Sequence, residues 1–221
     1  RPRAFYYPEL PQIQFFDRTQ FPWLAELEAA TPDIAKELMA VMEERAAFMP
    51  YLQADTRIAG NDPQKVRDNE GWRAYFLWKD GEPVEEHIKR CPKTMAALAQ
   101  VPLFNVPKRS PSILFSLLQP GARIAPHTGF INTRLICHLP LFTPPDCGFR
   151  VGNEERPWIT GKTFVFDDTI EHEAWNSSDQ TRVVLLFDIW RPELSTQEQG
   201  LIASLLQGVD SFSGEKTRWN V

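Results

Sequence analysis

The feature that most constrains the fold is a succession of short strand-forming runs that begins at Ser112. Pro, Gly, Asn and Asp separate the runs, which read SILFSLL, TRLICHL, GFRVG, KTFVFD, EHEAW and TRVVLLFDIW. Many short strands with turn formers between them are typical of an all-β sandwich or barrel. We therefore expect a jelly-roll type of double sheet over about residues 111–192.

The part of the chain before this β core is expected to form an arm and helices, over about residues 1–110. Residues 1–17 are rich in aromatic residues and prolines, which indicates an extended arm packed on a body. Thr31 has the chemistry of an N-cap, Pro32 suits the first helical position and Asp33 favours the positive end of a helix. A helix should therefore begin here and end near Met49. The polar segment 58–71 should be a surface loop.

Two further helices are expected. One should cover Pro92 to Gln100. The other should cover about residues 195–209, because Ser195 and Glu198 form a capping box at its start. Helices thus flank a mainly β fold, and we expect them to buttress one outer face of a single domain that spans residues 1–221.

Length, composition and charge exclude several classes of protein. A chain of 221 residues suits one domain with a substantial core, and a hydrophobic fraction of 43% argues against disorder. The net charge of −5 argues against nucleic-acid binding. We find no apolar run long enough to span a membrane and no signal-peptide pattern.

Three cysteines without a CxxC pair favour a reducing compartment, so we expect a cytoplasmic protein with free thiols. The first residue is Arg1 rather than Met, and a missing N-terminal segment would change that expectation.

Three of the four histidines lie close together in the sequence. His127, His138 and His172 fall within 46 positions. In TRLICHL the strand period of two places Arg134, Ile136 and His138 on one face and the apolar core residues on the other. That polar face could look into solvent or into a pocket inside a barrel. The fourth histidine, in PVEEHIKR, is surrounded by charges and should be solvated.

His172 and Arg182 lie on either side of the predicted turn NSSDQ, so a hairpin would let both face the same interior. Fe(II) oxygenases need two imidazoles that bind the metal and leave other coordination positions open. They also need an arginine that binds the distal carboxylate of a dicarboxylate cosubstrate. A histidine in a strand is also commonly a buried structural residue. Spacing alone supports the two interpretations about equally.

The region from Ser116 to Leu194 resembles the aspartyl/asparaginyl β-hydroxylase family of Fe(II)- and 2-oxoglutarate-dependent oxygenases, with the nearest relatives expected among bacteria. The matching stretches are FSLLQPGARIAPHTG, NTRLICHLPL, GFRVGNEERPW and GKTFVFDDTIEHEAWNSSDQTRVVLLFDIWRPEL. Weaker similarity extends upstream through GWRAYFLW and CPKTMAAL. The resemblance implies a double-stranded β-helix, a cupin-like jelly roll, which agrees with the strand pattern.

The resemblance also implies roles for individual residues. His127 and His172 would be the iron ligands, while Gly129 stands where other oxygenases place a carboxylate. Arg182 and Ser116 would bind the C5 carboxylate of 2-oxoglutarate. A further contact near the C1 end of the cosubstrate is implied for His138.

The expected function is that of a dioxygenase that uses O2, Fe(II) and 2-oxoglutarate and releases succinate and CO2. It would hydroxylate an unactivated carbon, such as the β-carbon of an aspartyl, asparaginyl or related amino-acid-derived substrate. The substrate would be a small molecule or a peptide, and the sequence does not name it. One alternative is a non-heme iron halogenase, which also uses a two-histidine site. The other is a non-catalytic β-helix protein that binds a small acid or a metal.

One departure from the family concerns the substrate. The animal member has an arginine where this chain has Ile136, so Arg134 is the remaining cation of that strand. Acceptance of an acidic substrate side chain is therefore in question. Arg150 would either meet an anionic substrate or be an ordinary surface arginine.

Several other residues have simpler interpretations. Asp167 and Asp168 are possible third ligands, but support of the loop before His172 explains them better. Glu173 alternates away from His172. Arg191 replaces a histidine common in relatives, and no role follows from the sequence. Three tryptophans are expected in the core or at its rim: Trp72, Trp175 and Trp190.

Overall fold

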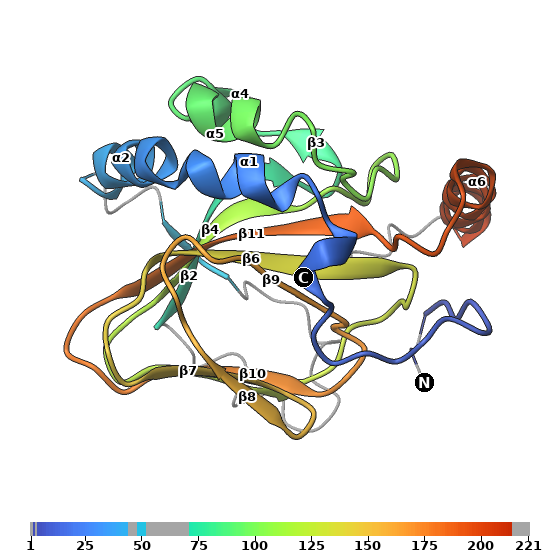
Figure 1. The fold of residues 1–221 in the computed structure, drawn as a ribbon. Helices are drawn as coiled ribbons and strands as arrows, with labels where there is room; N and C mark the ends of the chain where they lie inside the picture. Colours follow the sequence, from blue (N-terminus) through green and yellow to red (C-terminus); the bar gives the residue numbers. More distant parts are fainter. Residues whose placement is uncertain (1, 3, 44–47, 52–70, 214–221) are drawn as a thin grey trace.

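Two antiparallel sheets face each other in the computed structural model, which describes residues 2, 4–43, 48–51 and 71–213 (Figure 1). The larger sheet has the order β1-β2-β4-β11-β6-β9, with β3 paired to β2. Its strands are β1 (Met49–Pro50), β2 (Trp72–Lys79), β3 (Glu82–Pro83), β4 (Ile113–Leu118), β6 (Arg134–Phe142), β9 (Phe164–Phe166) and β11 (Arg182–Trp190). The smaller sheet has the order β5-β10-β7-β8. Its strands are β5 (Arg123–His127), β7 (Cys147–Val151), β8 (Glu154–Pro157) and β10 (His172–Asn176). The expected jelly-roll double sheet is confirmed.

Strict alternation divides the larger sheet into two faces. On β6, Leu135, Cys137 and Leu139 belong to the core under the helices, whereas Ile136 belongs to the cluster between the two sheets. The neighbouring strand β11 follows the same rule, since Leu186 faces the space between the sheets. The predicted separation of the two faces of TRLICHL is therefore confirmed.

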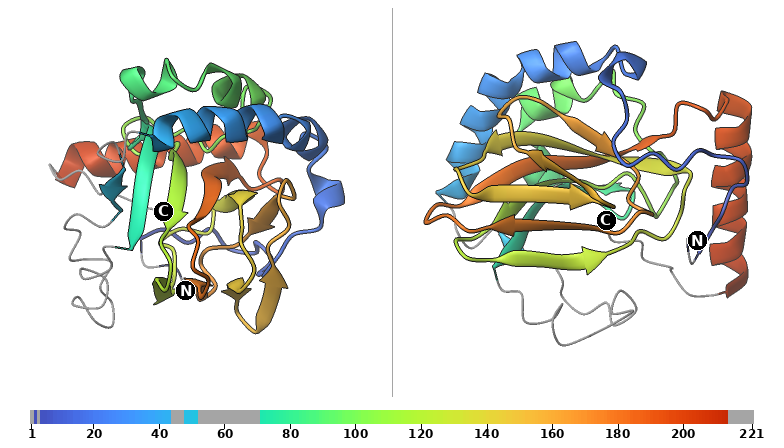
Figure 2. Two further views of the ribbon diagram at one scale, coloured as in Figure 1. Left: turned by 90° about the vertical axis from the view of Figure 1, so that its left-hand side faces the viewer. Right: turned by 60° about the horizontal axis from the view of Figure 1, so that its bottom comes forward.

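Helices cover the outer face of the larger sheet, above it in Figure 1 and along one side in Figure 2. They are the short 3₁₀ helix η1 (Arg18–Gln20), α1 (Leu24–Ala29), α2 (Thr31–Met42), α4 (Glu85–Ile88) and α5 (Pro92–Ala97). The last helix, α6 (Thr196–Ser213), lies at one end of the sandwich (Figure 1). It buries Ile202 and Leu206 in a cluster that also takes up Phe5 and Tyr7 of the N-terminal arm. The arm is therefore packed on the body, as expected.

The helix boundaries differ in part from those expected. Thr31 is not an N-cap, because α1 runs into α2 through the helical backbone of Ala30, and the Thr31 hydroxyl donates to the carbonyl of Glu28 at 2.7 Å. The assigned helix ends at Met42, and Met49 begins a strand instead.

At the other end of the chain the capping box is confirmed. Glu198 accepts a hydrogen bond from the backbone N–H of Ser195 at 2.8 Å, and the hydroxyl of Ser195 accepts one from the N–H of Glu198 at 3.3 Å. The helix that follows reaches Ser213, four residues beyond the expected end. In the middle of the chain α5 is shorter than expected and ends at Ala97.

The expectation that His87 is solvated was wrong. Its ring stacks on Tyr75 with a centroid distance of 3.9 Å, and its Nδ1 hydrogen-bonds the carbonyl of Phe76 at 2.6 Å. The charged residues next to His87 in the sequence gave no sign that its ring is partly buried and packs on Tyr75. The predicted loop 58–71 lies, except for Gly71, outside the described residues.

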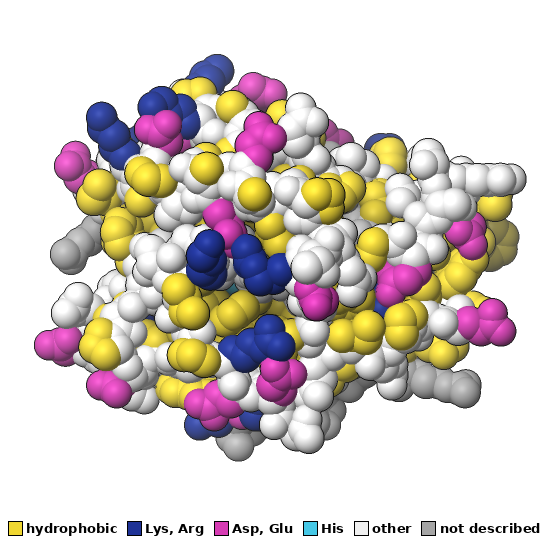
Figure 3. All heavy atoms as spheres, viewed as in Figure 1, with side chains coloured by type: hydrophobic (Ala, Val, Ile, Leu, Met, Phe, Trp, Pro, Cys, Tyr) yellow, Lys and Arg dark blue, Asp and Glu magenta, His cyan; other side chains and the backbone are white. Residues whose placement is uncertain are grey.

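Three surface and core properties complete the description. In the described ranges no helix is long and apolar enough to cross a membrane, and the three cysteines are free thiols. Figure 3 shows basic side chains beside acidic ones rather than gathered into one broad patch. Trp72 and Trp190 are buried and Trp175 is partly exposed, so all three fit the core or its rim.

Candidate active site

Two histidines face each other on adjacent strands of the smaller sheet. His127 ends β5, His172 begins β10, and the two are direct register partners. Their ring centroids are 4.1 Å apart. A register shift between His172 and Ala174 interrupts this pairing, and such bulges commonly re-aim side chains near functional sites. The fold thus brings together the two candidate metal ligands.

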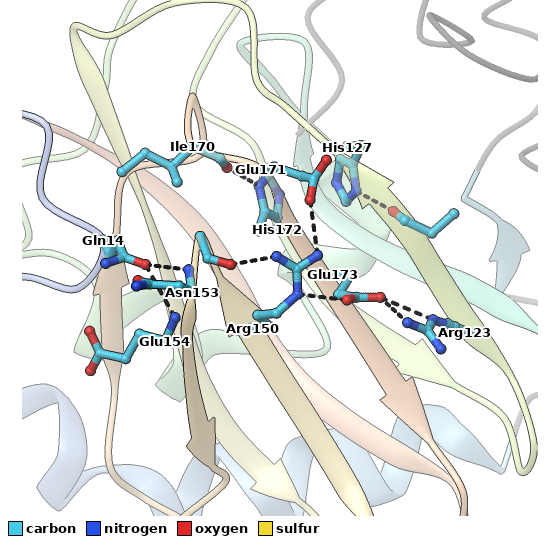
Figure 4. Close-up of polar contacts among 12 residues, drawn as sticks. Gln14, Arg123, His127, Arg150, Asn153, Glu154, Ile170, Glu171, His172 and Glu173 are labelled. Atoms are coloured by element: carbon cyan, nitrogen blue, oxygen red, sulfur yellow. Dashed lines mark hydrogen bonds and ion pairs between the residues drawn. The ribbon is translucent and has the colours of Figure 1, made fainter.

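Backbone carbonyls determine which ring nitrogen of each histidine is free. Nδ1 of His127 lies 2.8 Å from the carbonyl of Ala125, and Nδ1 of His172 lies 2.9 Å from that of Ile170 (Figure 4). A carbonyl only accepts, so Nδ1 donates and Nε2 keeps its lone pair. This orientation of metal-ligating histidines by a carbonyl is common in metalloproteins.

Electrostatics also favour neutral rings. Burial lowers the pKa of His127, and burial together with the neighbouring His127 lowers the pKa of His172 well below its ordinary value. Neutral imidazoles are the form that binds metal. The pair therefore suits a divalent cation held through two Nε2 atoms.

Among the residues that the structure describes, no third candidate ligand joins the pair. Within the described residues, no group of three or more His, Cys, Asp or Glu side chains could hold a metal ion. Gly129 lies against Asp168: its N–H donates to the Asp168 carbonyl at 2.6 Å, and a methyl group on Gly129 would overlap the Asp168 carboxylate. That carboxylate accepts from Arg134 at 3.0 Å.

Asp167 is likewise occupied, since it pairs with Arg191 at 3.1 Å and accepts from the N–H of Thr169 at 2.9 Å. Both acidic residues therefore support the loop before His172 rather than the metal site.

Arg182 lies buried inside the sandwich without a carboxylate partner among the described residues. One Nη donates weakly to the backbone carbonyl of Ser116 at 3.4 Å, and Nε has no hydrogen-bond partner. The guanidinium also lies over the ring of Trp158, 5.3 Å from its centroid. Burial lowers the pKa of Arg182 to about 10. A buried, unpaired guanidinium is suited to bind an anionic ligand.

Ser116 and His138 lie close to Arg182. The hydroxyl of Ser116 accepts from the indole N–H of Trp72 at 3.1 Å, which leaves its own hydrogen available for a ligand. His138 is buried, and its Nδ1 has no hydrogen-bond partner among the described residues. Its pKa is well below the ordinary value because of burial and because of the charges of Arg182 and His127. Arg182, Ser116 and His138 thus form one polar group near the histidine pair.

The two candidate substrate residues on β6 behave differently. Ile136 is fully buried and pairs in register with Phe166 of β9. Arg134 contacts Asp168 at 3.0 Å and Asp188 at 3.4 Å, and all three side chains are buried. Burial alone would lower the pKa of Arg134, but these two carboxylates outweigh burial and raise it. The charge of Arg134 is therefore already balanced inside the protein.

Arg150 is not brought to the site. It pairs across β7 and β10 with Glu173 at 2.6 Å, and it also binds Glu171 at 3.0 Å (Figure 4). Glu173 alternates away from His172, as expected, so this ladder lies on the outer face of the smaller sheet. Glu171 and Glu173 flank His172 in sequence, so Arg150 binds both sequence neighbours of this candidate ligand on the outer face of the sheet.

Three residues of this region were missed by sequence reasoning. Asp188 could have been found, because it lies six positions after Arg182 on β11 and therefore on the same face. Arg191 is buried and links the N-terminal arm to the loop before His172. Its guanidinium binds the carbonyl of Pro11 at 2.6 Å in addition to Asp167. Trp158 lies just after β8, where no periodic pattern could place it.

Comparison with known proteins identifies relatives over most of the chain. A family model described as Aspartyl/Asparaginyl beta-hydroxylase matches residues 28–192. The "Ornithine lipid ester-linked acyl 2-hydroxylase" of Rhizobium tropici is 34% identical over 189 residues, which cover 84% of this chain and 63% of that protein. The human "Aspartyl/asparaginyl beta-hydroxylase" is 31% identical over 191 residues, which cover 80% of this chain and 24% of that protein. "Aspartate beta-hydroxylase domain-containing protein 2" of Xenopus tropicalis is 26% identical over 93% of this chain and 54% of its own length. The chain thus spans less than two thirds of each of these relatives.

Proposed function

Because the chain belongs to the aspartyl/asparaginyl β-hydroxylase family, we propose that it is an Fe(II)- and 2-oxoglutarate-dependent hydroxylase. The observation that carries the proposal has two parts: two histidines whose Nδ1 atoms bind backbone carbonyls and leave Nε2 available, and a buried arginine that has no acidic partner among the described residues. A metal cation would bind the histidine pair, and an anionic cosubstrate would pair with the arginine.

Each residue has a defined task in this proposal. His127 and His172 hold the iron through Nε2, while their Nδ1–H groups keep the rings oriented. Arg182 binds the distal carboxylate of 2-oxoglutarate by charge-assisted hydrogen bonds, and Ser116 donates its hydroxyl hydrogen to the same group. In this proposal His138 contacts the other end of the cosubstrate. When bound, iron with 2-oxoglutarate and O2 supplies the oxidation of an unactivated C–H bond, with succinate and CO2 as coproducts.

Buried aromatic side chains exclude water from the region around His138 and His172. Phe149 lies 5.1 Å from the His138 ring and Phe166 lies 5.3 Å from the His172 ring, measured between centroids. Both phenylalanines are buried. Exclusion of water strengthens the electrostatic hold of Arg182 on the cosubstrate and protects reactive species from side reactions.

The site favours a substrate that is uncharged at the reacting group. Ile136 cannot pair a carboxylate, and Arg134 is already neutralised by Asp168 and Asp188. A buried carboxylate without a partner costs several kcal/mol. We therefore propose that the hydroxylated part of the substrate is an acyl chain or a neutral amino-acid side chain. The name of the Rhizobium tropici relative describes an acyl hydroxylase, which agrees with this view.

The proposal is tested by incubating the Fe(II)-loaded protein with 2-oxoglutarate, O2 and matched candidates. These are an N-acyl amino acid lipid, an asparaginyl peptide and an aspartyl peptide. We expect succinate formation coupled to a mass gain of one oxygen on a neutral substrate. A strong preference for the aspartyl peptide would contradict the substrate proposal and leave the cofactor proposal intact.

The same reactions with added chloride address the halogenase alternative, because a product that gains chlorine instead of oxygen would establish it. Binding of 2-oxoglutarate without consumption under all these conditions would favour the non-catalytic alternative.

A further inference from the structure

A tryptophan that follows β8, Trp158, lies beside two members of the polar group inside the sandwich, Arg182 and His138. The indole of Trp158 is in contact distance of the Arg182 guanidinium, at 5.3 Å from the ring centroid, and stacks at 28° on the His138 ring with a centroid distance of 5.8 Å. It also packs against Phe149 and Phe164, each with a centroid distance of 5.2 Å. Aromatic packing thus fixes the ring beside two of the three residues assigned to the cosubstrate, Arg182 and His138.

The polar edge of this indole is buried and has no partner. Nε1 of Trp158 makes no hydrogen bond with any described residue, and the same holds for Nε of Arg182 and Nδ1 of His138. An indole N–H can only donate, and a buried donor left unpaired is unfavourable. Trp72, on β2 of the larger sheet, differs in this respect, because its N–H is paired with Ser116 at 3.1 Å. Three neighbouring side chains therefore offer buried polar atoms that have no partner among the described residues.

We propose that Trp158 is a cosubstrate-binding residue, whose indole N–H donates to the distal carboxylate held by Arg182 and whose ring face positions that guanidinium. This assignment rests on the proposed function and adds to it a neutral donor and a cation–π contact. A carboxylate accepts several hydrogen bonds at once, so Arg182, Ser116 and Trp158 can all donate to it. The two contributions of Trp158, its N–H and its ring face, can be separated by substitution.

The experiment measures binding to the Mn(II)-loaded protein by isothermal titration calorimetry, without turnover. Two probes differ only at the distal end: 2-oxoglutarate, and 2-oxopentanoate, in which a methyl group replaces the distal carboxylate. Trp158→Phe keeps an aromatic face and removes the N–H. We expect it to weaken binding of 2-oxoglutarate roughly tenfold, the effect of one hydrogen bond to a charged group. Binding of 2-oxopentanoate should change by less than about twofold.

Two further variants complete the design. Trp158→Leu removes the ring face as well and should weaken 2-oxoglutarate further than Trp158→Phe. Trp175→Phe, on the partly exposed strand position beside Gly148, is the matched control and should leave both affinities unchanged.

The outcomes separate this inference from the proposed function. If wild type fails to bind 2-oxoglutarate, the proposed function fails. If wild type binds but Trp158→Phe binds 2-oxoglutarate equally well, or loses both probes to the same extent, the cosubstrate role of Trp158 is overturned.

Discussion

Replacing Arg182 by methionine should make the protein more stable while it destroys cosubstrate binding. In the structure the guanidinium is buried and has no acidic partner among the described residues. Methionine has a similar length and carries no charge. The substitution therefore removes an unfavourable buried cation from the folded state and leaves the packing largely filled.

The size of the effect follows from the pKa. Burial lowers the pKa of Arg182 from its ordinary value to about 10, and a change of that size corresponds to roughly 3 kcal/mol of unfavourable free energy in the folded state. The group is a base with a lowered pKa, so at pH 7 the penalty is fully present. Against it stand the cation–π contact with Trp158, worth about 1–2 kcal/mol, and the weak hydrogen bond to Ser116, worth at most about 1 kcal/mol. We expect a net gain of about 1 kcal/mol in the free energy of unfolding.

The assay is urea unfolding at pH 7, followed by circular dichroism, with and without 2-oxoglutarate. In its absence, Arg182→Met should raise the urea midpoint at an unchanged slope. Saturating 2-oxoglutarate should stabilise wild type by about 2.7 kcal/mol at a hundredfold excess over Kd and leave the variant unaffected. Arg182→Lys keeps the charge and serves as the control, which should show no gain. A lower midpoint for Arg182→Met in the absence of ligand would mean that the cation already has a favourable partner, and would refute the reasoning.

The remaining predictions concern metal binding, close packing and a helix cap. His127→Ala and His172→Ala should each abolish Mn(II) binding in calorimetry while the circular dichroism spectrum is retained, since neither of only two ligands can be spared; wild-type affinity in either variant would remove the metal assignment. Gly129→Ala should lower the free energy of unfolding by about 3–5 kcal/mol, because its methyl group would displace the buried, ion-paired Asp168 carboxylate, and an unchanged urea midpoint would contradict this. Ser195→Ala should cost about 1 kcal/mol through loss of the α6 cap and leave Mn(II) affinity unaltered; a loss of affinity would show that the helix acts on the site.

Alternation explains why much of the fold could be predicted. In TRLICHL every second residue had to be buried among apolar side chains, so the polar face with Arg134 and His138 followed directly from the period of a strand. The same rule placed Glu173 away from His172. The helix start at Thr31 failed because capping chemistry is local, whereas the short preceding helix α1 supplies the backbone continuity that makes a cap unnecessary.

The candidate site was predictable where the chain carries a periodic signal or a family motif, and not elsewhere. Arg150 was expected either to meet an anionic substrate or to be an ordinary surface arginine, and the register of β7 against β10 sets it opposite Glu173 on the outer face. Sequence gives the alternation within one strand and not the pairing between strands. Trp158 follows a strand end, where no period applies, and only the packed structure places it beside Arg182.

The candidate iron ligands and the candidate cosubstrate residues belong to different sheets. His127 and His172 lie on adjacent strands of the smaller sheet, whereas Ser116, His138 and Arg182 lie on the larger one. The histidine pair is therefore set by hydrogen bonds within one sheet, while the full constellation needs both sheets docked. Sub-global opening that separates the sheets, of the kind that amide hydrogen exchange detects, would leave the imidazole pair intact and dismantle the cosubstrate pocket. The proposed activity would thus depend on the closed sandwich, and we expect loss of affinity for 2-oxoglutarate to precede loss of metal affinity as the sandwich loosens.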